Sequence, residues 1–162
     1  MKYILFLLAT IIGTSISAQD LSENKRHILK SVEKHEAKLI EISDAIWASA
    51  EIAFEENQSS DLLADYAEEN GFKVDRGVAG MPTAFVATYG SGKPVISVLG
   101  EFDALPGISQ KAVPTKSPLK IGAAGHGCGH NLFGAASLGS AIAVKELIEN
   151  GNIEETIKFL GT

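Results

Sequence analysis

The chain has 162 residues, of which 45% are hydrophobic and 21% are charged, as in an ordinary globular domain and unlike a disordered segment. This length is enough for one domain with its own core. The formal net charge is −6 and the chain has no block of Lys or Arg, which argues against nucleic-acid binding because phosphate neutralisation needs a basic face.

Residues 1–18 have the layout of a secretory signal peptide. Lys2 supplies the positive start, residues 3–12 are almost wholly apolar, and small residues lead up to Ala18, after which we expect cleavage. The apolar run is shorter than the roughly 20 residues of a membrane span, although an N-terminal anchor is the alternative. We therefore expect an exported protein, periplasmic or secreted, whose mature chain over 19–162 has no stable membrane insertion.

Hydrophobic periodicity predicts two helices in the first half of the mature chain. Apolar residues recur at helical spacing through residues 21–50, with Lys and Glu on the other face. A second helix is predicted over 60–70, because Ser59 or Ser60 can cap its N-terminus and Gly71 can end it.

The period then changes to that of strands. Apolar alternation or continuous apolar runs predict four strands, over residues 72–76, 84–89, 95–99 and 156–160. The strand over 95–99 is apolar throughout, as in a strand that is covered on both faces. A third helix over 131–150 precedes the last strand. Helices followed by strands, one of them buried on both faces, indicate an α/β or α+β layer fold.

A long loop over residues 100–129 carries the first two candidate functional residues, and loops of this length are usually functional. Glu101 and Asp103 follow the strand over 95–99 and are two residues apart, so they project to the same side if the chain stays extended. Strand ends are where open α/β sheets bind ligands. The alternative is two solvated loop carboxylates.

The segment from His126 to His130 is the more specific signal. His126, Cys128 and His130 alternate with glycines, and imidazole and thiolate are ligands of zinc and related divalent ions. Cys128 is the single cysteine, and a metal would hold its thiolate and shield it in an oxidising compartment. We therefore predict a metal site here.

Three other interpretations of this segment stay open. A phosphate-binding loop would also be Gly-rich at a helix start, but the Lys-Ser/Thr pair of a P-loop is missing. A cysteine nucleophile with a histidine base is disfavoured because residues two apart rarely face each other for proton transfer. The third is a chance grouping of packing residues.

Residues 100–107 and 125–132 resemble motifs of the metal-dependent amidohydrolases and carboxypeptidases of metallopeptidase family twenty (M20). Within that family the chain is most similar to the aminobenzoyl-glutamate hydrolase-like subgroup, which residues 46–56 also resemble. The resemblance implies a zinc-exopeptidase-like α/β catalytic domain, with a mixed sheet and flanking helices. It also implies two divalent metal ions, zinc or manganese.

The resemblance assigns roles to individual residues. Cys128 would be the metal-bridging ligand, His130 a terminal ligand on one ion, and Asp103 the catalytic carboxylate that orients the site. Many relatives have a metal-binding His two residues before Asp103, where this chain has Glu101, so Glu101 is the weaker ligand candidate. His126 would at best support the ligands or contact the substrate.

The implied activity is hydrolysis of an amide bond in an N-acyl amino acid or an aminobenzoyl-glutamate-like small molecule. In the family the general-base Glu follows the strand that precedes Thr162, so we expect a truncated chain that is inactive by itself. Residues 19–162 would then be the N-terminal portion of an incomplete catalytic domain. The dimerisation domain, through which the full-length protein would form a homodimer, would be absent. The alternative is a non-catalytic exported metal-binding module on a peptidase-like scaffold.

Overall fold

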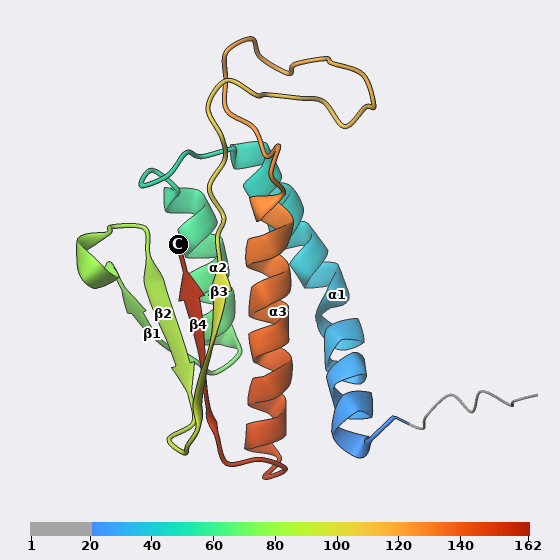
Figure 1. The fold of residues 1–162 in the computed structure, drawn as a ribbon, viewed down its shortest axis with the longest axis vertical. Coiled ribbons are helices and arrows are strands. Elements are labelled where there is room, and N and C mark those ends of the chain that lie inside the picture. Colours follow the sequence, from blue (N-terminus) through green and yellow to red (C-terminus); the bar gives the residue numbers. More distant parts are fainter. Residues whose placement is uncertain (1–20) are drawn as a thin grey trace, which may run out of the picture.

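A computed structural model describes residues 21–162, so the predicted signal peptide over 1–18 lies outside the described residues. In chain order the described elements are α1 (Glu23–Ser49), α2 (Asn57–Glu69), β1 (Lys73–Arg76), the 3-10 turn η1 (Val78–Gly80), β2 (Phe85–Tyr89), β3 (Val95–Gly100), α3 (His130–Glu149) and β4 (Thr156–Gly161). Figure 1 shows α3 lying between α1 and the strands. The predicted elements are confirmed in type and order, with ends that differ by up to three residues.

The four strands form one mixed sheet in the order β1-β2-β4-β3. β2 pairs antiparallel with β1 and with β4, whereas β3 and β4 run parallel and are connected through α3. A parallel pair needs such a crossover, which a helix usually provides. The predicted mixed sheet with flanking helices is therefore confirmed.

The core lies between one face of the sheet and the helices. Alternate residues of the two central strands are fully buried on that face, among them Phe85 and Ala87 of β2 and Ile157 and Phe159 of β4. α2 packs against β1 and β2, and α3 packs against β3 and β4. α3 is apolar around most of its circumference because its other side packs against α1.

The prediction that β3 is covered on both faces is wrong for the described residues. β3 is an edge strand, and Val95, Ile96 and Leu99 are 53%, 48% and 46% exposed. Only β4 pairs with it, and α3 covers only one of its faces. Several apolar side chains of β3 are therefore left exposed by the residues that the structure describes.

The N-terminus of α2 also differs from the prediction. The helix begins at Asn57, and neither Ser59 nor Ser60 caps it. Instead the Glu51 carboxylate accepts hydrogen bonds from the backbone amides of Gln58 (3.0 Å) and Ser59 (2.9 Å). Burial acts to raise the pKa of Glu51, but these hydrogen bonds outweigh it and lower the pKa.

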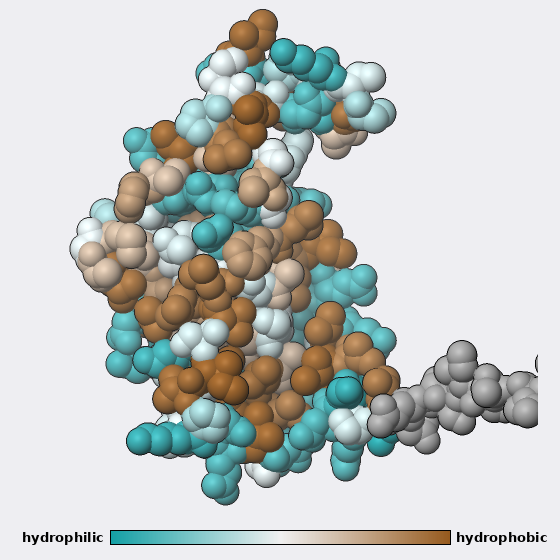
Figure 2. All heavy atoms as spheres, viewed as in Figure 1, coloured by the Kyte–Doolittle hydropathy of each residue, from teal (hydrophilic) through white to brown (hydrophobic). Residues whose placement is uncertain are grey.

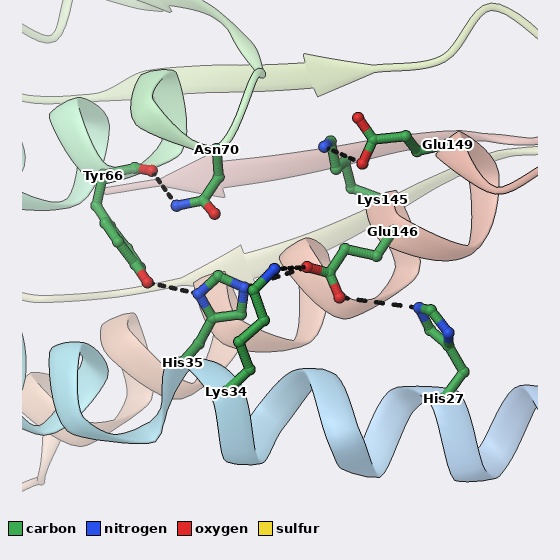
Figure 3. A network of polar contacts seen from close by, with 8 residues as sticks. All are labelled: His27, Lys34, His35, Tyr66, Asn70, Lys145, Glu146 and Glu149. Carbon is green, nitrogen blue, oxygen red and sulfur yellow. Dashed lines mark hydrogen bonds and ion pairs between the residues drawn. The ribbon is translucent and has the colours of Figure 1, made fainter.

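A polar network ties the three helices together at the end of α3 away from the candidate site (Figure 3). Glu146 of α3 accepts a hydrogen bond from Lys34 at 2.7 Å and lies 3.3 Å from His35 Nε2, both on α1. His35 Nδ1 lies 2.6 Å from the Tyr66 hydroxyl of α2. Burial acts to raise the pKa of Glu146, but the hydrogen bonds from Lys34 and His35 lower it to about 2.

Within residues 21–162, no helix combines the length and hydrophobicity that crossing a bilayer would require.

Candidate metal site

The candidate site lies where the chain leaves β3 and enters α3. Residues 101–104 continue β3 in extended form because Phe102 N donates to Thr162 O (3.0 Å) and Ala104 N donates to Glu51 O (2.7 Å). Phe102 is fully buried in the core. Glu101 and Asp103 therefore project away from the core on the same side, as their spacing predicted.

His130, the first residue of α3, lies between these two carboxylates. Its Nδ1 donates to Asp103 Oδ1 at 2.6 Å, and its Nε2 lies 3.1 Å from Glu101 Oε2. The imidazole and the Asp103 carboxylate are largely shielded from solvent, while Glu101 is more exposed. The structure thus brings together three of the predicted site residues, from segments 27 positions apart in the chain.

Gly129 allows the chain to turn sharply between Cys128 and His130. It is the N-cap of α3 and has a left-handed backbone (φ 86°), which a residue with a side chain rarely adopts. Cys128 is free and exposed just before this turn. Among residues 21–162, no three His, Cys, Asp or Glu side chains are grouped so that they could hold a metal ion.

His126 contacts the backbone of α1. Its Nε2 lies 3.0 Å from the carbonyl oxygen of Ile46, which holds the Gly-rich loop against the end of that helix. Burial lowers the pKa of His126, and the hydrogen bond to Ile46 only partly opposes this. Nε2 donates to the Ile46 carbonyl, so His126 positions the loop.

Glu56 is a buried acid beside the site that was not among the predicted site residues. It is 3% exposed and accepts a hydrogen bond from the Thr83 hydroxyl at 2.7 Å. It lines a small cavity of about 140 Å³ together with Asp103 and Thr162. Periodicity does not separate buried Glu56 from its exposed neighbour Glu55, since both lie in a bend. Only the resemblance of residues 46–56 to the M20 subgroup pointed to this segment.

Several known proteins share sequence with this chain, although no family model matches it. A p-aminobenzoyl-glutamate hydrolase subunit of Escherichia coli (strain K12) is 43% identical over 142 residues, which cover 87% of this chain and 30% of that protein. Thermostable carboxypeptidase 2 of Saccharolobus solfataricus is 32% identical over 124 residues, which cover 75% of this chain and 30% of that protein.

The fold agrees with these sequence matches. The crystal structure of the Bacillus subtilis YXEP protein, a dinuclear metal-binding peptidase of the M20 family, superposes with a TM-score of 0.66 at 23% identity. The match covers 80% of this chain and 35% of that one. The chain is thus similar in sequence to a hydrolase subunit over most of its own length, and its fold is that of an M20 peptidase domain. It spans about 30% of the length of these curated relatives, which are named as hydrolases and peptidases.

Proposed function

We propose that this chain takes part in metal-dependent hydrolysis of an amide bond in an N-acyl amino acid or an aminobenzoyl-glutamate-like substrate. The observation that carries the proposal is the contact between His130 and Asp103. His130 follows the free thiol of Cys128 by two residues. The 43% identity to a protein named as part of an aminobenzoyl-glutamate hydrolase supports this choice of substrate class.

The donor types fit two divalent ions. A thiolate from Cys128 and an imidazole from His130 suit zinc, while the nearby carboxylates would also accept manganese. When bound, such ions would polarise the scissile carbonyl and make water a stronger nucleophile at neutral pH. Within residues 21–162 these donors do not form a three-donor group.

The residues of this chain would prepare the ligands. Asp103 accepts a hydrogen bond from His130 Nδ1, which fixes the ring and would make Nε2, which faces Glu101, the nitrogen that binds a cation. Glu101 lies on the Nε2 side and would neighbour an ion bound there. Glu56, close to Asp103 in the same cavity, adds a further carboxylate that would favour cation binding.

Export and dimerisation are also part of the proposal. The layout of residues 1–18 supports cleavage after Ala18 and a periplasmic or secreted location. The family resemblance supports a homodimer of the full-length protein. Mass spectrometry of the mature N-terminus and cell fractionation would test the first point, and sedimentation equilibrium would test the second.

The test of the proposed function measures metal content and hydrolysis on the full-length protein. We expect bound zinc or manganese and release of glutamate from aminobenzoyl-glutamate, both lost in Cys128→Ala. Leu132→Ala is a matched control, because Leu132 is exposed on the first turn of α3 and has no donor atom. Unchanged turnover in Cys128→Ala would refute the role given to the thiol.

A non-catalytic exported metal-binding module is the second candidate. It rests on the same donors, the free Cys128 thiol and the His130 imidazole that Asp103 holds at the start of α3. It predicts metal binding that depends on Cys128 and His130, but no release of glutamate from any acyl-glutamate offered. The same two measurements therefore separate the candidates.

A further inference from the structure

The long loop that carries the site also forms an ordered arm, residues 105–125. Leu105 and Gly125 form an antiparallel bridge at its base, and Ser109 N donates to Ala123 O at 2.9 Å further out. Lys111 N donates to Ser117 O at 2.8 Å near its tip. Figure 1 shows the arm extending beyond the ends of α1 and α3.

The arm is a positive segment in a negative protein. No Asp or Glu occurs between Asp103 and Glu146, whereas the arm carries Lys111, Lys116 and Lys120. None of the three lysines forms an ion pair within residues 21–162. Their ammonium groups therefore remain available to an anion from outside the chain.

A hollow of about 350 Å³ separates the arm from the C-terminal end of α1. Its lining includes Trp47 and Ser49 from α1, and Gln110, Lys111 and Lys120 from the arm. This volume is within the range of small-molecule sites, and its lining combines a flat aromatic surface with two cations. Lys116 belongs to the same arm but does not line this hollow.

The arm wall of the hollow is held in place by Gln110. Its Nε2 donates to the carbonyl of Thr115 at 2.7 Å, and its Oε1 accepts from the amide of Ser117 at 2.9 Å. These bonds close the tip of the arm on itself. The segment that bears Lys111 is therefore held before a ligand binds, which reduces the entropy lost on binding.

We propose that this basic hollow binds a small carboxylate with a flat apolar body, with Lys111 and Lys120 contacting the carboxylate and Trp47 contacting the body. The hollow is also lined by Gly125, His126 and Gly127, the residues just before Cys128. Resting on the proposed function, we assign to it the carboxylate-bearing amino-acid part of an N-acyl amino acid substrate with an aromatic side chain, as a determinant of specificity.

Trp47 makes the proposal testable on the full chain, since it is the only tryptophan and lies in the hollow. We expect benzoate to change its fluorescence saturably. Benzamide keeps the ring without the charge, and acetate keeps the charge without the ring. Each should bind about tenfold more weakly than benzoate, as expected for loss of a charge-assisted contact or of ring burial.

Variants locate the site. Lys111→Gln and Lys120→Gln should each weaken benzoate binding about tenfold, whereas Lys116→Gln, with the same change of charge on the same arm, should leave it nearly unchanged. The proposal is overturned if wild-type protein binds benzoate no better than benzamide, or if Lys116→Gln weakens binding as much as the other two.

The binding titration needs neither metal nor turnover. If benzoate fails to bind, the proposal for the hollow is overturned. The proposed amide hydrolysis and its dependence on Cys128 are then still judged by their own test. If hydrolysis fails while benzoate binds through Lys111 and Lys120, the hollow stands as a carboxylate site and only its assignment to an amide substrate falls.

Discussion

At the scale of single residues, the site depends on how a few side chains are held. His130 is fixed through Asp103 at 2.6 Å, and Asp103 is itself fixed by a backbone anchored on both sides, through Phe102 and Ala104. Gly129 supplies the left-handed turn that separates the exposed thiol from the partly buried imidazole. These contacts would preorganise the proposed metal ligand His130 at little further loss of side-chain entropy.

We predict that Asp103→Asn lowers metal affinity by about 10- to 100-fold, because the amide cannot hold the His130 ring with a carboxylate's strength. Competition with a chromogenic chelator on the full-length protein would measure this. Asp44→Asn, an exposed position on α1, removes the same charge and should change nothing. Equal affinity in wild type and Asp103→Asn would show that the contact has no part in metal binding.

At the scale of elements, the helices are joined by apolar packing and by polar contacts, among them the network around Glu146. Apolar residues of α1 and α3 contribute to the common core, and Glu146 connects α3 to Lys34 and His35 of α1 (Figure 3). His35 is 8% exposed, so its ring nitrogens need partners within the protein. Without Glu146, His35 Nε2 would lose the partner that the network provides.

We predict that Glu146→Gln destabilises the chain by about 1 kcal/mol near neutral pH, the usual effect of weakening a partly buried charge-assisted hydrogen bond. The folded-state pKa of Glu146 is about 2, below its ordinary value of 4.5. Its contribution to stability is therefore present above about pH 4.5 and is lost as pH falls toward 2.

Urea denaturation at several pH values would measure this effect. The stability difference between wild type and Glu146→Gln should shrink as the pH is lowered from about 6 to about 3. Glu149→Gln is the matched control, because Glu149 is on the same helix but is half-exposed and pairs only with Lys145 among the described residues. A pH-independent difference would contradict the role of the carboxylate charge.

At the scale of the whole molecule, the uncovered edge of the sheet is the main feature. β3 has apolar side chains on both faces but one strand neighbour, and Figure 2 shows apolar side chains at the surface over the strands. Unpaired apolar edges pair readily with other strands, and most proteins protect them. Val95 and Leu99 face away from the helices, on the face that no described helix covers.

We predict that the 162-residue chain self-associates through β3 at micromolar concentration, and that Val95→Lys shifts it toward monomer. Ile121→Lys introduces the same charge at a position that is 90% exposed on the arm, away from any sheet edge, and should have little effect. Analytical ultracentrifugation would measure both. If the two variants alter association equally, net charge rather than the β3 edge controls it.

Much of the fold follows from local patterns in the sequence. The period of apolar residues indicates each described helix and strand, because burying one face needs side chains at 3.6- or 2-residue spacing. Sequence patterns fail to predict a helix end when the side chain that caps it lies several residues away in the chain. The start of α2 depends on Glu51, and a serine-based capping rule does not consider an acid several residues upstream.

For the site, the order of residues along the chain was enough to indicate the candidate donor groups. These are a thiol and two imidazoles among glycines, and two carboxylates at a strand end. Which of these groups meet became clear from the folded chain alone. Folding joined His130 to Asp103 and Glu101, turned His126 toward α1, and buried Glu56 beside Asp103. The physical reason is that side-chain contacts between distant segments are set by strand register and helix packing, which periodicity does not specify.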